Sequence, residues 1–346
     1  MNTSNSGSHG HDLTVIDVID ETSDARSIVF RTPLEHREQF TYLPGQFLTL
    51  RIPSERTGHV ARSYSLSSAP DIDDDLKVTV KRTVAGYGSN WLCDNILPGD
   101  TVTVLPPSGR FTPGRYTNDL LLFAAGSGIT PVMSILKTAL FRSDCQVALF
   151  YANRSRDAVI FRSELDGYLD KFRDRLTVRY WFDDAEGFPS SEIIEQVAVR
   201  HARAEALFCG PAPFMSTVAS GLRGAGVPAE RQHMEVFSSI SGDPFTAPIL
   251  TVDDSAETID TEVRLDGDTH RFDWPVNGTL VDVLLSRGVE VPYSCRSGEC
   301  GSCACTVVSG SVVMEKSDIL SAEDIADGYV LGCQSRPVSG PIEIEF

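Results

Sequence analysis

The 346-residue sequence predicts a multidomain protein: an antiparallel β-barrel, then an α/β domain with a parallel sheet, then a small α+β domain. Three observations support this prediction. Short β-branched segments separated by turn residues fill residues 12–114. From residue 115 to 237, apolar strand-like runs alternate with helical stretches. Five of the eight cysteines then lie within the last 52 residues.

The first predicted domain, residues 12–114, consists of closely spaced strands. Its apolar segments read LTVIDVID, RSIVFRTP, QFLTLRIP, LKVTVKRT and DTVTVLPP, and Pro, Gly and Asp separate them. Strands spaced in this way are typical of an antiparallel barrel. Residues 1–11 are polar, with no apolar core and no basic start, so we expect a disordered tail and not a secretory signal.

The second predicted domain spans residues 115–237. The run LLLFAAG has strand length and no polar position, which suits a strand buried on both faces. A glycine-containing turn and the helical stretch VMSILKTALF follow it, and strand and helix patterns then alternate. This alternation predicts a parallel sheet with helices on both faces.

The last predicted domain, residues 259–346, follows a linker at 238–258 that is rich in Ser, Asp, Pro and Thr. A tight turn at Asp266 and Gly267 predicts a hairpin. The segment TLVDVLLSRG predicts a short helix that ends at Gly288. A cysteine-rich loop and a final strand, IEIEF, complete the domain.

Composition and charge exclude several classes of protein. The net charge of −18 argues against binding to nucleic acid or anionic membranes. No apolar run approaches the roughly 18 residues of a membrane-spanning helix, so we expect a cytoplasmic protein. Residues 251–346 hold 18 Asp/Glu and 6 Lys/Arg, a net of −12. This excess is either an ordinary solvated surface or a docking face for a basic partner.

The cysteine loop predicts a metal centre. Cys295, Cys300 and Cys303 have the spacing C-x4-C-x2-C, and 29 residues separate the last of these from Cys333. This is the plant-type ligand pattern for a [2Fe–2S] cluster. A zinc site is the alternative, but zinc sites favour paired C-x2–4-C motifs. We interpret Cys305, like Cys93 and Cys145, as a buried apolar residue.

A flavin site is predicted where a barrel strand reads Arg-Ser-Tyr-Ser. Arg62 can form a charge-assisted bond with a pyrophosphate, Tyr64 can face an isoalloxazine ring, and Ser65 can reach its N5 atom. The helix that follows offers backbone N–H groups to phosphate. The candidate flavin-binding residues are Arg62, Ser63, Tyr64, Ser65, Val80, Lys81, Gly88, Ser89 and Asn90. Taken alone, the strand could equally be an ordinary one with an exposed arginine.

A nicotinamide site is predicted at the glycine turn of the second domain. The motif G-x-G-x-x-P follows a buried strand and opens a helix, where a pyrophosphate is expected. A second motif, Cys-Gly-Pro, closes a later strand of the same sheet. The candidates are Gly126, Gly128, Thr130, Pro131, Cys209, Gly210, Pro211 and Phe237. We assign catalytic roles to Tyr64, Ser65, Cys209 and Phe237, the last as a cover for the flavin.

Together these motifs resemble the ferredoxin–NADP reductase superfamily with a plant-type ferredoxin domain fused at the C-terminus. The resemblance covers residues 12–346 and rests on LPGQFLTLRIPSERTGHVARSYSL, GYGSNWLCDNILPGD, AAGSGITPVMSI, CGPAPFM and SCRSGECGSCACT. It implies a β-grasp fold for the last domain, and FAD, a [2Fe–2S] cluster and NADH as cofactors. Within the superfamily, these segments look most like the actinobacterial reductase components of 3-ketosteroid 9α-hydroxylases. The resemblance therefore implies a separate Rieske-type oxygenase as partner.

The order of the three motifs also has a chemical reason. A hydride carries two electrons and an iron–sulfur cluster accepts one, so a flavin must lie between them. Phenylacetyl-CoA epoxidase reductases have the same layout, and a non-catalytic iron–sulfur sensor and a free diaphorase remain further alternatives. Arg154 and Arg156 follow a strand where the adenosine is expected and would suit the 2′-phosphate of NADPH, whereas the resemblance favours NADH.

Overall fold

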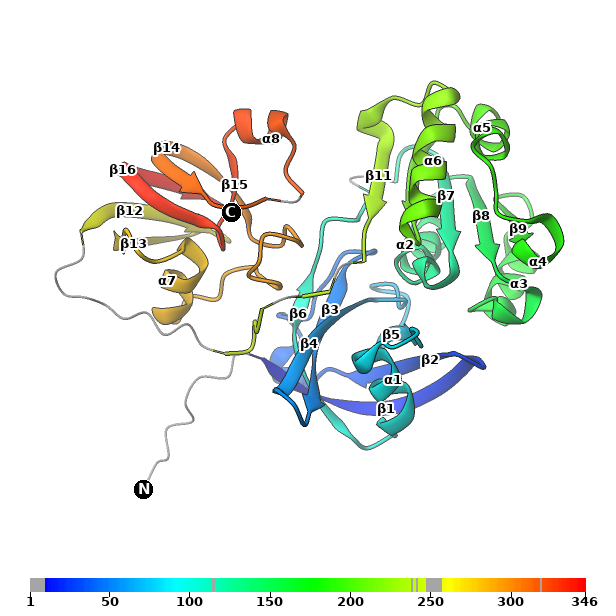
Figure 1. Ribbon diagram of the computed structural model, residues 1–346, viewed down its shortest axis with the longest axis horizontal. Helices are drawn as coiled ribbons and strands as arrows, with labels where there is room; N and C mark the ends of the chain where they lie inside the picture. The colour runs from blue at the N-terminus through cyan, green and yellow to red at the C-terminus, as the bar shows by residue number, and fades with distance from the viewer. Residues whose placement is uncertain (1–9, 114–115, 238, 241, 247–256, 318) are drawn as a thin grey trace.

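The computed structural model describes residues 10–113, 116–237, 239–240, 242–246, 257–317 and 319–346. Three bodies are visible in Figure 1: a barrel in blue and cyan, an α/β domain in green, and a smaller sheet domain in yellow to red. The latter two both lie against the barrel (Figure 1). Most of the predicted N-terminal tail and linker lies outside the described residues. The first strand begins at His11.

The barrel is a six-stranded antiparallel sheet with the order β4-β3-β6-β1-β2-β5. An isolated bridge between Leu66 and Val78 closes it, and Ser67 N donates to Lys77 O at 2.7 Å beside the bridge. Alternate strand residues point inward, as the period-2 pattern requires. The elements are β1 (His11–Thr22), β2 (Ala25–Arg31), η1 (Leu34–His36), β3 (Phe47–Ser54), β4 (Gly58–Ser65), β5 (Leu76–Lys81), α1 (Tyr87–Asn95) and β6 (Thr101–Ser108).

The second domain is a five-stranded parallel sheet with the order β11-β10-β7-β8-β9. Every residue of β7 and β8 is buried, which confirms central strands covered on both faces. Its strands are β7 (Leu120–Ala125), β8 (Val147–Asn153), β9 (Leu176–Phe182), β10 (Glu205–Cys209) and β11 (Gln232–Glu235). Its helical elements are η2 (Gly126–Gly128), α2 (Ile129–Arg142), η3 (Arg156–Ala158), α3 (Arg162–Lys171), α4 (Asp183–Glu186), α5 (Ser191–Val199), α6 (Ala212–Gly224) and η4 (Ala229–Arg231).

The C-terminal domain is a mixed sheet with the order β13-β12-β16-β14-β15, in which β12 and β16 are parallel. Asp266 and Gly267 have φ of 51° and 88°, the left-handed conformation that the predicted hairpin turn needs. Thr279 caps helix α7, whose buried face packs on the sheet. The elements are β12 (Thr258–Leu265), β13 (Asp268–Pro275), α7 (Leu280–Ser286), β14 (Ala304–Met314), α8 (Ala322–Ala326), β15 (Tyr329–Leu331) and β16 (Ser335–Glu345). The predicted α+β architecture is confirmed.

The barrel contributes residues to the cores of both neighbouring domains. Ala25 and Phe111 pack into the α/β core cluster. Ala61 and Leu105 pack into the core cluster of the C-terminal domain, together with Phe245 from the segment before it. The barrel therefore lies between the other two domains. Within the described residues, no helix has the length and apolar character to cross a membrane.

Candidate functional site

The predicted flavin strand, β4, presents two of its candidate residues to helix α1. Arg62 and Tyr64 alternate with Ser63, so both point to the same face of the sheet. A Cβ atom placed on Gly88 would lie 3.0 Å from Arg62 Cγ and 3.6 Å from Tyr64 Oη. The structure thus brings Arg62, Tyr64 and Gly88 together, and the small residue allows the helix to approach the strand. Ser65, at the end of β4, is buried.

At the start of helix α1, backbone N–H groups and not side chains are available to bind a ligand. Ser89 Oγ accepts a hydrogen bond from Thr83 N at 3.2 Å, and Asn90 Nδ2 donates to Thr83 O at 3.2 Å. These two side chains therefore close the turn before the helix. The N-cap residue, Gly86, has no side chain to cap the first turn. The free N–H groups of this turn can bind a phosphate.

A cavity of about 900 Å³ adjoins the Arg62 side of this site. Tyr87 and Trp91, on helix α1, supply its aromatic surface, and Tyr87 Oη donates to Pro53 O at 2.7 Å. Sequence reasoning did not single out these two aromatic residues. The cavity leaves room for the adenosine half of a dinucleotide flavin beyond the pyrophosphate. It is lined by Pro53, Ser54, Glu55, Arg56, Thr57, Gly58, Val60, Arg62, Tyr87 and Trp91.

Burial keeps Tyr64 neutral, and Lys81 places a positive charge at the edge of the site. Desolvation raises the pKa of Tyr64, so its phenol stays protonated. Val80 is completely buried in the barrel, so only its backbone can contact a cofactor. Lys81 Nζ lies 3.9 Å from Asp24 Oδ2 and 3.6 Å from a Cβ atom placed on Gly126. Lys81 thus connects the barrel with the glycine turn of the second domain.

The glycine turn packs directly on the Cys-Gly motif. Gly126 has a φ of +54°, and a Cβ atom on Gly128 would overlap the carbonyl oxygen of Cys209. Only glycine fits this second position without a shift of the backbone. A Cβ atom on Gly210 would in turn lie 3.0 Å from Ala125 Cβ. The two motifs, about 80 residues apart, therefore form one surface at the carboxyl ends of β7 and β10.

The remaining nicotinamide candidates surround this surface. Thr130 Oγ1 donates to Ser127 O at 3.0 Å, and Pro131 is buried in the first turn of α2. Pro211 precedes α6 as its N-cap residue. Phe237 follows β11 and is 49% exposed, so its ring has room to cover a ligand. Its position over a flavin stays a prediction.

Glu235 is a titratable group beside this surface that sequence reasoning missed. It is the register partner of Cys209, at the end of the short strand β11. Desolvation raises its pKa to about 8, and burial raises the pKa of the Cys209 thiol well above its ordinary value. The thiol is therefore neutral, whereas the carboxyl titrates near neutral pH. Its position at the end of a strand, just before the apolar pair Val236 and Phe237, was the only signal for it.

The four cysteines of the loop lie in two pairs. Cys295 N donates to Cys300 Sγ at 3.4 Å, and Cys333 N donates to Cys303 Sγ at 3.4 Å. Among the described residues, no three His, Cys, Asp or Glu side chains converge as they would around a single ion. Two pairs fit a two-iron cluster, in which four thiolates share two irons, better than they fit a tetrahedral zinc ion.

Backbone amides of the loop point at the sulfur atoms. Ser297 N and Glu299 N each donate to Cys295 Sγ at 3.4 Å, and positive φ values at Gly298 and Gly301 allow the loop to turn in this way. Such donors stabilise thiolate sulfur. Cys305 differs: it is buried in β14, and its Sγ donates to Val330 O at 3.8 Å. This geometry agrees with its omission from the predicted ligands.

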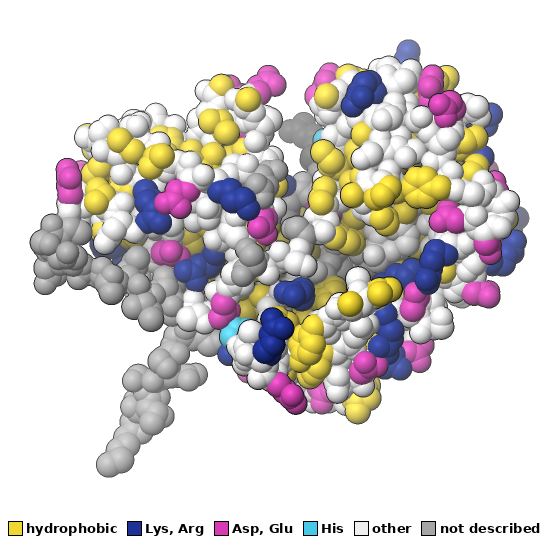
Figure 2. All heavy atoms as spheres, in the orientation of Figure 1, with side chains coloured by type: hydrophobic (Ala, Val, Ile, Leu, Met, Phe, Trp, Pro, Cys, Tyr) yellow, Lys and Arg dark blue, Asp and Glu magenta, His cyan; other side chains and the backbone are white. Residues whose placement is uncertain are grey.

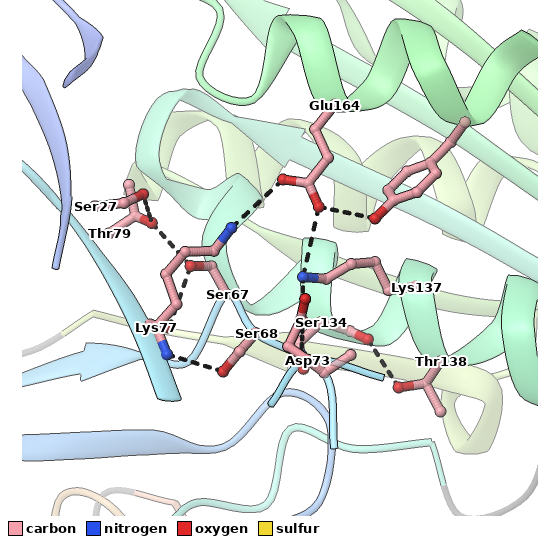
Figure 3. A network of polar contacts seen from close by, with 12 residues as sticks. Ser27, Ser67, Ser68, Asp73, Lys77, Thr79, Ser134, Lys137, Thr138 and Glu164 are labelled. Atoms are coloured by element: carbon pink, nitrogen blue, oxygen red, sulfur yellow. Dashed lines mark hydrogen bonds and ion pairs between the residues drawn. The ribbon is translucent and has the colours of Figure 1, made fainter. Parts of the chain in front are cut away.

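A network of charged groups around the buried Lys137 joins the barrel to helix α2 of the α/β domain (Figure 3). Lys137 Nζ, on α2, lies 2.6 Å from Asp73 Oδ2 of the barrel and 3.6 Å from Glu164 Oε1 of α3. Lys77 Nζ, on the barrel strand β5, lies 3.5 Å from Glu164 Oε2. Sequence reasoning did not find this network. The network fixes the glycine turn relative to the predicted flavin strand. Figure 2 shows that the surface is hollowed where the barrel and the α/β domain meet.

The structure shows the surroundings of the two arginines at the expected adenosine end of the nicotinamide site. Arg154 Nη2 lies 2.6 Å from Asp24 Oδ2 of the barrel, so its charge is compensated. Arg156 lies over the ring of Phe182, 5.7 Å from its centroid. Asp183, the first residue after β9, has a buried Oδ1 atom without a hydrogen-bond partner among the described residues. Burial, followed by the neighbouring Asp184, raises the pKa of Asp183.

Three family models match this chain in the order that the motifs predict. An oxidoreductase FAD-binding domain matches residues 12–112, an oxidoreductase NAD-binding domain matches 122–220, and a 2Fe-2S iron-sulfur cluster binding domain matches 263–338. The chain thus contains domains for FAD, for a nicotinamide and for a [2Fe–2S] cluster. The geometry described above agrees with each of them.

Similar proteins match over the whole chain. A ferredoxin reductase component of 3-ketosteroid-9-alpha-monooxygenase from Rhodococcus rhodochrous is 55% identical over 98% of both chains, and its counterpart from Mycolicibacterium smegmatis is 48% identical over 98% of both. A component of 1,2-phenylacetyl-CoA epoxidase from Escherichia coli is 31% identical over 97% of both. The solved structure of phthalate dioxygenase reductase shares the fold, with 24% identity, a TM-score of 0.57 and coverage of 97% of this chain and 98% of the other.

Proposed function

Since the chain belongs to the family of ferredoxin reductase components of 3-ketosteroid-9-alpha-monooxygenases, we propose that it passes electrons from NADH to a separate Rieske-type oxygenase. The observation that carries this proposal is the central position of the barrel. The glycine turn of the α/β domain lies beside Lys81 of barrel strand β5, and Ala61 of the predicted flavin strand, β4, packs in the core cluster of the cysteine-loop domain. A flavin bound there would adjoin both a hydride donor and a one-electron acceptor.

Each predicted site residue has a distinct part in this proposal. FAD, when bound, takes up two electrons as a hydride and releases them one at a time. Arg62 and the first-turn amides of α1 hold its pyrophosphate, while Tyr64 supports its ring and stays neutral. The glycine turn and the surface around Cys209 hold the nicotinamide beside Lys81 of β5. Cys295, Cys300, Cys303 and Cys333 hold the cluster.

We propose NADH as the hydride donor because of the geometry at the place where the adenosine is expected. Arg154 is engaged by Asp24, which weakens the attraction for a 2′-phosphate that the sequence suggested. The unpartnered Asp183 Oδ1 can accept a hydrogen bond from a ribose hydroxyl, as acidic residues do in NAD-binding sites. A 2′-phosphate at the same place would meet a carboxylate. The ribose hydroxyl therefore fits better than the phosphate.

The steroid pathway is proposed on the identity of the relatives. The relatives at 47–55% identity are named for 3-ketosteroid-9-alpha-monooxygenase, whereas the epoxidase component is 31% identical. Reductase components of glycine betaine monooxygenase are 29–30% identical. The oxygenase that accepts the electrons selects the substrate. Assignment to an epoxidase is therefore the second candidate function.

Reconstitution with purified oxygenases tests the proposal. The protein is combined with NADH and either a 3-ketosteroid 9α-hydroxylase oxygenase or a phenylacetyl-CoA epoxidase oxygenase, and the products are measured. We expect product and coupled NADH oxidation with the steroid oxygenase. Product with the epoxidase alone would overturn the steroid assignment but keep the electron path. NADH oxidation that never reduces the cluster would overturn the path itself.

A further inference from the structure

The segment just before the first cluster ligand is anchored on the barrel. We call residues 290–295 the docking segment. Glu290 accepts two hydrogen bonds from Gln39 Nε2, at 3.2 and 3.1 Å. Ser108 Oγ, on β6, donates to Tyr293 O at 3.4 Å. The cysteine loop therefore begins at a place that the barrel determines.

The most buried of these anchors is a contact between two hydroxyl groups. Thr49 Oγ1, on β3, lies 2.7 Å from Ser294 Oγ, and the two residues are each 1% exposed. Thr49 Oγ1 also lies 3.0 Å from Ser63 Oγ, its register partner on the flavin strand β4. Ser294 directly precedes Cys295. Three hydroxyls thus form a continuous chain from the flavin strand to the first cluster ligand.

The directions of the side chains on β4 explain why this row of three hydroxyl groups matters. Arg62 and Tyr64 point toward helix α1, where we propose the flavin. Ser63 lies between them in sequence and points to the opposite face. Ala61, on that same opposite face, packs in the core cluster of the C-terminal domain. A single strand therefore separates the flavin face from the face that receives the docking segment.

We propose that Thr49 and Ser294 are positioning residues that hold the cluster loop at the distance from the flavin required for electron transfer. This inference rests on the proposed function, because it concerns the step between two of its centres. Removal of the Thr49 hydroxyl would leave the buried Ser294 hydroxyl and the partly buried Ser63 hydroxyl without this partner. Such a loss would lower the equilibrium constant for docking about tenfold, which corresponds to about 1.4 kcal/mol. Electron transfer slows in proportion, because it requires the docked arrangement.

Anaerobic stopped-flow measurements on the full-length holoprotein separate the two electron steps. Flavin reduction by NADH and the later reduction of the cluster are followed by their different absorbance changes. For Thr49→Val, we expect an unchanged flavin phase and a cluster phase about tenfold slower. Thr49→Ser keeps the hydroxyl and should restore the cluster phase. Iron content and the electron paramagnetic resonance signal of the reduced cluster should match the wild type in both variants.

Variants on the other side of the contact keep the inference testable if Thr49→Val folds poorly. Ser294→Ala should also slow the cluster phase, and the double variant should be no slower than Thr49→Val alone, since Thr49→Val already removes the contact with Ser294. A wild-type cluster rate in Thr49→Val or Ser294→Ala would overturn the inference. Failure of the wild-type protein to reduce its cluster from NADH would instead overturn the proposed function.

Discussion

Lys137 Nζ lies 2.6 Å from Asp73 Oδ2, and the lysine side chain has no exposed surface. The pair joins helix α2, which begins at the glycine turn, to the loop that precedes β5 of the barrel. Charged groups this deeply buried are tolerated only when they are paired. The ion pair therefore fixes how the nicotinamide domain is placed on the flavin domain.

Removal of this lysine should destabilise the interface between the two domains. Lys137→Met leaves Asp73 and Glu164 without their buried cation, which should cost about 3 kcal/mol, near the lower limit for a broken buried pair because both carboxylates keep some exposure. We expect a lower thermal midpoint and slower flavin reduction by NADH. Arg173→Met removes an exposed ion pair on α3 and is the control, with a change within about 0.5 kcal/mol. Equal midpoints in the two variants would contradict this interpretation.

The ligand assignment predicts different outcomes for two neighbouring cysteines. Cys333→Ser removes one member of a sulfur pair, so we expect the cluster to be lost or strongly destabilised. Cys305→Ser changes a thiol that contacts Val330 O within the core and should leave the iron content close to two per chain. Iron analysis and visible absorbance measure both results. Comparable iron loss in the two variants would show that the ligand set is wrong.

The raised pKa of Glu235 predicts a pH-dependent preference for the oxidised nucleotide. As pH rises through about 8, the carboxyl ionises beside the proposed nicotinamide site and attracts the positively charged ring of NAD⁺. The ratio of Kd for NAD⁺ to Kd for NADH should therefore fall between pH 7 and 9. Glu235→Gln should make this ratio independent of pH over that range. Fluorescence titrations would measure it, and a flat wild-type profile would exclude Glu235 from the site.

The raised pKa of Glu235 also makes the stability of the folded protein depend on pH. The ordinary value for this carboxyl is 4.5, so between about pH 4.5 and 8 the unfolded chain is ionised while the folded chain keeps the proton. Glu235 therefore opposes folding increasingly as pH rises through this window, and its cost is complete above pH 8.

The acidic residue at the end of β9 should determine the choice between the two nicotinamide donors. Asp183→Asn removes a negative charge from the place where a 2′-phosphate would lie, so kcat/KM for NADPH should rise at least about tenfold relative to NADH. Asp184→Asn is the matched control, because Asp184 is exposed and should change the ratio less. Steady-state kinetics with both nucleotides provide the measurement. An unchanged ratio in Asp183→Asn would place the adenosine elsewhere.

The acidic surface of the last domain predicts sensitivity of electron delivery to salt. Residues 251–346 carry a net charge of −12, which should steer this domain toward a basic patch on the oxygenase. Raising the ionic strength from about 0.01 to 0.15 M shortens the screening length from roughly 30 to 8 Å. Product formation should slow over this range, while flavin reduction by NADH changes far less. Equal salt responses of the two steps would argue against electrostatic docking.

Local patterns in the sequence were sufficient to predict the three architectures, whereas the assignment of the cluster ligands stays a prediction. The turn at Asp266 and Gly267 has the backbone conformation that its residues require, and the runs of β7 and β8 are buried throughout. The spacing of the cysteines determines the geometry of a loop whose residues are mostly close in sequence. Features of this kind are predictable because the residues that determine them are close in sequence.

Contacts between distant segments were not predictable from these patterns. The sequence alone suggests Arg154 as a phosphate ligand, because it does not show that Asp24, 130 residues away, compensates its charge. Thr49 and Ser294 are 245 residues apart, and no periodicity distinguishes a buried hydroxyl from a surface one. Glu235 gains its raised pKa from burial, which depends on how the domains pack. Such features need the tertiary structure.

The order of the three domains along the polypeptide differs from their order in space. Along the polypeptide the flavin domain is first, but in space it is in the middle, since residues such as Ala25 and Ala61 lie in the cores of its two neighbours. The path of the electrons therefore does not follow the path of the chain. A circularly permuted gene that placed the ferredoxin module before the barrel would encode the same electron path, provided that the new linker spans the docked domains. The order of such modules along the chain can change without redesign of the route between their cofactors, as long as contacts such as that between Thr49 and Ser294 are kept.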